Sequence, residues 1–117
     1  MSAALRGGTL TRGISVQART TQRDSFGQQV LGWVEIKQVY ALIEALTGSE
    51  RDAAMSISTD ISHRITVRYD DIWADPKTVA TYRIVYGTRL FNVNAAMNID
   101  EANRVVELLC TEGLTYG

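Results

Sequence analysis

The sequence predicts a mainly β protein with about six strands, one short helix and a long flexible loop, arranged as a small antiparallel β-barrel or a compact sandwich. Apolar and polar residues alternate with a period of two over residues 12–19, 60–70 and 81–95, which is the pattern of half-buried strands. Turn-forming residues recur about every 10 to 15 residues, a spacing that suits short strands. The 117 residues, of which 45% are hydrophobic, suffice for one core. We therefore expect a single domain over residues 1–117, with residues 1–8 as a flexible N-terminal tail.

The first expected strand, residues 12–19, places its apolar side chains at alternate positions on one face. Residues 20–32 follow without a sustained period and are rich in polar residues, so they predict a long loop. A loop of this length in a small domain is either mobile or a contact surface. Phe26 within it is a candidate docking group, although an aromatic ring in such a loop more often folds back onto the core.

Residues 33–46 predict a strand with a bulge or a sharp bend, because their alternation changes phase after Gln38. Bent strands of this kind pass from one wall of a small barrel to another. The helical propensity of residues 44–46 favours a helix instead, but the β-branched and aromatic residues of the segment outweigh it.

A short helix is predicted over residues 50–56, because Ser49 and Asp52 have the spacing of a capping box. The clearest strand of the chain follows over residues 60–70, where apolar and polar side chains alternate without interruption. Residues 70–77 contain the only proline and predict a turn region.

The C-terminal part predicts a hairpin and one ambiguous segment. Residues 81–86 and 89–95 are expected to be strands joined by a tight turn at residues 87–88. Residues 100–112 fit two structures. Asp100 can cap a helix whose apolar residues have a helical period, whereas alternate residues of the second half share one face of a strand. Local propensity favours the helix.

The sequence carries no recognisable catalytic constellation, and we expect neither an enzyme nor a cofactor or metal site. It has one histidine, His63, one cysteine, Cys110, and no nucleophile-elbow, phosphate-loop or zinc-protease motif. The adjacent carboxylates Asp70 and Asp71 would point to opposite faces of a strand and make a poor acid–base pair. His63 lies on an apolar strand face, which is typical of a core or interface histidine.

Charge and cysteine content predict a soluble protein of a reducing compartment. A single cysteine excludes an internal disulfide and a cysteine zinc site. No apolar stretch is long enough for a signal peptide or a membrane span. The net charge of −1 excludes a generic polybasic nucleic-acid binder. The basic residues are ten Arg and two Lys, a bias that suits bidentate contacts with other macromolecules.

Candidate contact residues lie in two segments and on one strand. The segments 20–32 and 47–60 carry little core-forming pattern, so they are candidate contact arms. Arg64 and Arg68 lie on the polar face of the central strand, where they either form a solvated face paired with acids or meet DNA phosphates or a neighbour's carboxylates. The candidate subunit or DNA-channel contacts are Arg19, Arg23, Asp24, Phe26, Glu50, Arg51, Arg64 and Arg68.

Several short motifs follow one another in a fixed order from about residue 8 to residue 112. They are GTLTRGISVQART, DSFG, Trp33, Tyr40-Ala41, GSER at 48–51, HRITVRY at 63–69, RLFNV at 89–93 and LLCTE at 108–112. In this order and spacing, the chain resembles the head–tail joining proteins of tailed bacteriophages, also called head–tail adaptor, head closure or stopper proteins. Prophages and gene transfer agents also encode such chains.

The resemblance implies a small β-barrel that forms a homo-oligomeric ring of about twelve copies below the portal, from subunits that can be monomeric in isolation. The ring would extend the DNA channel, close the DNA-filled head and provide the tail attachment surface. The implied partners are the portal or adaptor ring, the tail terminator protein and double-stranded DNA in the channel, with no membrane and no cofactor. The implied location is the virion, after assembly in the bacterial host cytoplasm.

The resemblance also implies a strand over residues 103–111, against the local helix signal, and no catalytic residues. The near-neutral net charge agrees with a channel protein, because tight neutralisation of phosphates would hinder the sliding of DNA.

Two other functions stay open. A small OB-like barrel could bind single-stranded nucleic acid through Arg64, Arg68, Tyr69 and Arg83, although the net charge of −1 counts against it. A tail-side completion protein would share the assembly role but have a different neighbour. Three aromatic residues are expected to be core fillers rather than stacking platforms: Trp33, Trp73 and Tyr40.

Overall fold

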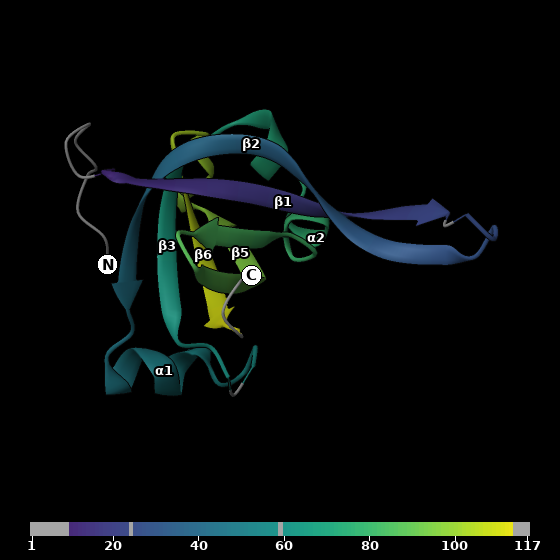
Figure 1. Ribbon diagram of the computed structural model, residues 1–117. Coiled ribbons are helices and arrows are strands. Elements are labelled where there is room, and N and C mark those ends of the chain that lie inside the picture. Colours follow the sequence, from purple (N-terminus) through teal and green to yellow (C-terminus); the bar gives the residue numbers. More distant parts are fainter. Residues whose placement is uncertain (1–9, 24, 59, 114–117) are drawn as a thin grey trace.

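The computed structural model describes residues 10–23, 25–58 and 60–113. Six antiparallel strands close into a barrel in the order β1-β2-β3-β6-β5-β4. Figure 1 shows the barrel with β1 and β2 crossing its upper side. The strands are β1 (Arg12–Arg23), β2 (Gln29–Ala45), β3 (His63–Arg68), β4 (Arg83–Tyr86), β5 (Arg89–Asn98) and β6 (Val105–Glu112). The predicted mainly β fold and its six-stranded barrel are confirmed. The predicted tail, residues 1–8, and Asp24 lie outside the described residues.

The main core fills the barrel with side chains from all six strands and from the segment between β3 and β4. That segment, predicted as a turn region, contains η2 (Asp71–Trp73) and a second short helix, α2 (Pro76–Val79). Trp73 is 2% exposed and meets Tyr82 edge to face, with ring centroids 6.0 Å apart. The strand residues of the main core are Ile14, Val16, Ala41, Ile65, Val67, Ile84, Phe91, Val93, Val106, Leu108 and Cys110.

The predicted helix after Gly48 is present as α1 (Gly48–Ala54), but its capping box differs from the predicted one. The Glu50 N–H donates to Thr47 Oγ1 at 3.3 Å, and the Thr47 N–H donates to Glu50 Oε1 at 2.9 Å. The cap is therefore Thr47 rather than Ser49, and the helix begins two residues before the predicted start at residue 50. Its Ala54 packs in a second small cluster with Ile61 and Leu109, on the outside of the barrel.

Helix α1 covers the outer face of residues 105–112, which explains why their sequence pattern fitted both a helix and a strand. The segment forms strand β6, so the helix favoured by local propensity is wrong. Leu108 and Cys110 face the main core, while Leu109 between them belongs to the cluster with α1. Both faces of the strand are buried, which removes the alternation that would have identified it.

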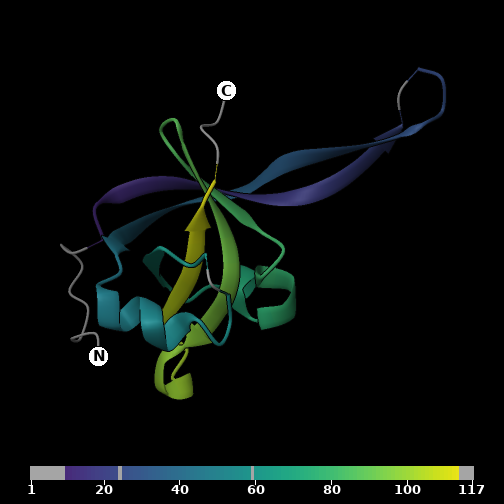
Figure 2. The ribbon, with the colours of Figure 1, turned by 90° about the horizontal axis from the view of Figure 1, so that it is seen from below.

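A two-stranded ribbon extends from the barrel and is its most prominent feature (Figures 1 and 2). Beyond the β1–β4 pair Gln17↔Arg83, residues 18–23 of β1 pair only with residues 29–34 of β2. We call residues 18–34 the arm. The turn at its tip includes Gly27, whose φ of +80° lies in the left-handed region that favours glycine.

The arm overturns the prediction of a long flexible loop over residues 20–32. Most of that segment is strand, with a short turn that includes residues 25–27. The alternation failed as a signal because the ribbon leaves the barrel and has no core on which to bury one face. Arg19 and Arg23, expected at or within the loop, lie in β1 and pair with Trp33 and Gln29 of β2.

Strand β2 passes from the arm to the barrel at a β-bulge. Val16 pairs with Lys37 and Gln17 pairs with Glu35, so Ile36 is the extra residue. The predicted bend in residues 33–46 is therefore present, slightly earlier than the predicted position after Gln38. Among the described residues, no helix is long and apolar enough to cross a membrane.

Candidate interaction surfaces

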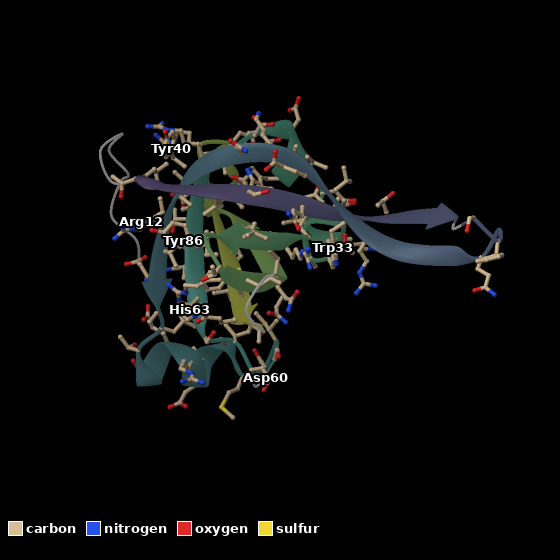
Figure 3. The ribbon with its side chains drawn as sticks, viewed as in Figure 1. Arg12, Trp33, Tyr40, Asp60, His63 and Tyr86 are labelled. Atoms are coloured by element: carbon tan, nitrogen blue, oxygen red, sulfur yellow. The ribbon has the colours of Figure 1, made fainter. Side chains whose placement is uncertain are left out.

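The root of the arm carries a cluster of two arginines and one tryptophan, labelled at Trp33 in Figure 3. Arg19 and Trp33 are cross-strand partners, and Arg83 of β4 pairs with Gln17. The guanidinium carbons of Arg19 and Arg83 lie 5.5 and 4.3 Å from the Trp33 ring centroid, within cation–π range. Trp33 is thus half-buried beneath two cations and is not the core filler that was expected.

A cleft of about 380 Å³ adjoins this cluster. Arg83 Nε donates to Gln17 Oε1 at 2.7 Å, which fixes that guanidinium beside the cleft. Among the described residues, no acidic side chain lines the cleft, so none of them places a carboxylate opposite the Arg19 guanidinium there. The lining residues are Arg19, Trp33, Ala80, Thr81, Tyr82, Asn92 and Val93.

Two exposed aromatic side chains are Phe26, in the turn before β2, and Tyr40, within β2. Phe26, at the tip of the arm, is 89% exposed, so the expectation that it folds back onto the core is wrong. Tyr40 is 67% exposed and is likewise not a core filler, whereas Trp73 is. Figure 3 shows Tyr40 at the far end of the barrel from the arm.

The two arginines predicted as a stripe on β3 have different surroundings. Arg64 Nη1 donates to Glu50 Oε2 at 2.7 Å, and Arg64 Nε donates to Glu44 Oε1 at 3.3 Å. Arg64 thereby ties α1 to the barrel. Arg68 is exposed and lines another cleft, of about 330 Å³, with Tyr40. The first of the two alternatives, a face paired with acids, therefore describes Arg64 but not Arg68.

The candidate contacts on α1 differ in the same way. The pKa of Glu50 is lowered to about 2, first by the Thr47 backbone N–H and then by Arg64. Glu50 is thus committed to the helix cap and the barrel. Arg51 beside it is exposed.

His63 lies in a polar cluster between β3, β5 and β6. Ser62 Oγ is 2.8 Å from His63 Nδ1, and His63 Nε2 is 3.9 Å from Glu112 Oε1. Arg89 holds the Glu112 carboxylate with two donors, at 2.9 and 3.1 Å. The His63 ring meets Phe91 edge to face, with centroids 5.1 Å apart.

The order serine, histidine, glutamate resembles a catalytic triad, but the geometry does not support one. The distance of 3.9 Å is too long for a hydrogen bond, and Arg89 already neutralises Glu112. The Ser62 hydroxyl also accepts the Glu112 N–H at 3.2 Å. The cluster joins three strands, in agreement with a packed histidine. Within the described ranges, no group of three or more His, Cys, Asp or Glu side chains could hold a metal ion.

Sequence reasoning missed the cluster at the root of the arm, although it singled out Arg19 and Trp33 separately. Their proximity depends on pairing β1 with β2, and that pairing was hidden once residues 20–32 were interpreted as a loop. A hairpin interpretation would have placed the two side chains opposite each other.

Comparisons with known proteins agree with the barrel. A search of curated proteins finds no match. Protein SF1141 from Shigella flexneri 2a has a solution structure that aligns with a TM-score of 0.67 and 24% identity, covering 93% of this chain and 97% of that one. A chain of the virion of a native gene transfer agent particle aligns with a TM-score of 0.62 and 23% identity, covering 91% of this chain and 96% of that one. At this identity, the two structures support the fold.

The family is shown by a sequence comparison. A family model described as phage head completion protein matches residues 5–113, nearly the whole chain. This match agrees with the motif order from about residue 8 to residue 112. The description of the family indicates a structural role in the phage particle. The chain belongs to the family of phage head completion proteins.

Proposed function

We propose that this protein forms a ring at the portal vertex of a tailed phage or prophage particle, where it closes the DNA-filled head and provides the surface to which the tail attaches. Its neighbours would be the portal or adaptor ring on one side and the tail terminator protein on the other. Double-stranded DNA would pass through the channel, and assembly would take place in the cytoplasm of the bacterial host.

The arm is the structural feature that supports a ring, in addition to the family match. A two-stranded ribbon has little stability alone in water, because half of its backbone groups and both of its faces lack a partner within the ribbon. Six residue pairs, from Ala18↔Val34 to Arg23↔Gln29, have no third strand beside them. A ring supplies such a partner, since a contact between the arm of one subunit and the body of the next uses two different surfaces and can close on itself.

The structure does not form the groove that the hypothesis of single-stranded nucleic-acid binding requires. The groove would need Arg64, Arg68, Tyr69 and Arg83 on one surface. Instead Arg64 is bound by Glu44 and Glu50, and Arg83 lies over Trp33. Arg68 and Tyr69 line a different cleft.

Deletion of the gene tests the proposed position. Head building and DNA packaging precede closure, so they should proceed normally without this protein. The defect should follow as heads that lose their DNA and free tails that never attach, both visible by negative-stain electron microscopy. Filled heads that carry no tails, together with complete DNA retention, would instead indicate a tail-side role.

A further inference from the structure

We propose that the cleft at the root of the arm binds the acidic turn Asp100–Glu101 of a second copy of this chain. This inference rests on the proposed ring, because it names the contact between neighbouring subunits. It assigns a binding role to the cluster of Arg19, Trp33 and Arg83.

The cleft has the chemistry of a carboxylate site. Arg19 is exposed and forms no ion pair with any residue in the described part of the chain, while its guanidinium lies over Trp33. Arg83 is held beside it by Gln17. The exposed guanidinium of Arg19, which lines the cleft, can bind a carboxylate with two parallel hydrogen bonds. Thr81 and Asn92 add polar groups to the wall of the cleft.

The acidic turn follows β5 and has an unusual backbone. Asp100, Glu101 and Asn103 have φ values of 55°, 49° and 55°, in the left-handed region that non-glycine residues rarely adopt. The Asn98 side chain fixes this shape, since its Nδ2 donates to Asn103 Oδ1 at 2.7 Å and its Oδ1 accepts the Asn103 N–H at 3.1 Å. Strained backbone persists where the surrounding structure enforces it, and it is concentrated at contact sites.

Both carboxylates of the turn point to the surface without a counter-charge. Asp100 and Glu101 are exposed, and neither forms an ion pair within the ranges that the structure describes. The turn therefore presents two negative charges in a fixed geometry, and Arg19 presents a positive charge in a cleft that no described carboxylate lines.

The two surfaces lie on opposite sides of the molecule. In Figure 2 the arm leaves the upper side of the barrel, while the turn after β5, drawn in yellow-green, lies at the lower side. One subunit cannot join them, but a row of subunits can, each placing its turn in the cleft of the next. Such a contact between two different surfaces is the kind that generates a ring.

A DNA phosphate is the other anion that the cleft could bind, and the second copy is favoured for two reasons. Two arginines beside a cleft offer only a small contact to a duplex, whose binding depends on many neutralised phosphates. The chain also carries complementary acids itself, in the turn on the opposite side of the barrel from the arm.

Charge exchange tests the contact. Arg19→Glu should raise the concentration of protein that half-restores DNA retention to heads made without it by about tenfold or more, because like charges then face each other. Asp100→Asn with Glu101→Lys should do the same. The chain carrying all three substitutions has both charges exchanged at every interface, and it should return to within about threefold of wild type. Arg12→Glu, on the other end of β1, and Asp60→Lys are matched controls that should change little.

Disulfide cross-linking between engineered cysteines tests the contact directly. Thr81→Cys on the cleft and Glu101→Cys on the turn, in separate chains that are then mixed, should form a disulfide-linked dimer, both free at high concentration and on heads. Asp60→Cys mixed with Thr81→Cys should not. The native Cys110 does not interfere, because it is 0% exposed and its burial raises the thiol pKa.

The outcomes separate the contact from the proposed function. Absence of the dimer in both settings overturns the contact, even if wild-type protein restores DNA retention. Formation of the dimer with no effect of the protein on the heads supports the contact and contradicts the portal position. If Arg19→Glu weakens binding to duplex DNA in a gel-shift assay and leaves the dimer unchanged, the cleft binds DNA and the proposal is wrong.

Discussion

Arg64 and Arg89 hold the protein's own elements together. Arg64 joins β3 to Glu44 on β2 and Glu50 on α1, and Arg89 holds Glu112 across two strands. Arg19, at the root of the arm, has no such acid among the described residues. The same residue type therefore serves the fold in one place and is left available for contact in another.

His63 should make folding stability depend on pH. Burial is the main cause that lowers the pKa of His63 below its ordinary value of 6.5. The unfolded chain then binds a proton at a higher pH than the folded chain does. The free energy of unfolding should fall as the pH drops below about 6.5 and level off below the folded pKa.

Replacement of the histidine isolates this contribution. His63→Gln should remove the decline that begins below about pH 6.5, measured by urea unfolding at several pH values. Losses at still lower pH belong to carboxylates such as Glu50 and Glu112, whose lowered pKa values stabilise the folded state only while they stay ionised. Equal slopes for wild type and variant in the histidine range would contradict this account.

The corrected capping box gives a second prediction for single residues. Thr47→Ala should cost about 1 kcal/mol of stability, because the first turn of α1 loses the hydroxyl that accepts the Glu50 N–H. Ser49→Ala, at the position that the sequence favoured, should cost much less. Chemical unfolding measures the loss in free energy of unfolding for both variants. A larger loss for Ser49→Ala than for Thr47→Ala would contradict Thr47 as the helix cap.

At the scale of the elements, two contrasting environments limited what the sequence could predict. Strand β3 was predicted well because its apolar and polar side chains alternate, with Ile65 and Val67 in the core and Arg68 exposed on the other face. Strand β6 looked helical because α1 covers its outer face, so Leu108 and Leu109 are both buried. The arm looked like a loop because it has no core beside it. Period-two alternation reports a strand with one buried face, and these two elements have two buried faces or none.

The tip of the arm should matter for assembly and not for folding. Phe26→Ser should change the free energy of unfolding by less than about 0.5 kcal/mol, since the ring is 89% exposed. The same variant should weaken the rescue of heads that lack the protein. Met97→Ser, another exposed apolar residue on the barrel, is the matched control and should rescue normally. A Phe26→Ser protein that assembles like wild type would exclude the tip as a contact.

At the scale of the whole molecule, the barrel and the arm have different roles. The barrel buries its own core and accounts for the fold that two solved structures share at 23% and 24% identity. The arm and the acidic turn leave the barrel on opposite sides. A molecule with this form is suited to a ring, in which each subunit covers the exposed parts of the next. Motif order predicted the family, while the contact surfaces required the three-dimensional pairing of β1 with β2.

Many weak contacts can act together on a template. A single interface of this size can be too weak to hold two subunits in solution, and the portal would then hold many subunits close together and raise their effective concentration. Purified protein can therefore be monomeric without contradicting a ring in the virion.

Addition of purified protein to heads made without it is the most direct test of the central claim. Packaged DNA is held at high density, so an open portal favours its exit. Heads without the protein should lose their DNA and refuse tails, and wild-type protein should restore both DNA retention and tail attachment. Nuclease-resistant DNA and the fraction of heads with tails measure the two steps. Heads that keep their DNA and accept tails in the absence of the protein would contradict its proposed role in closing the head.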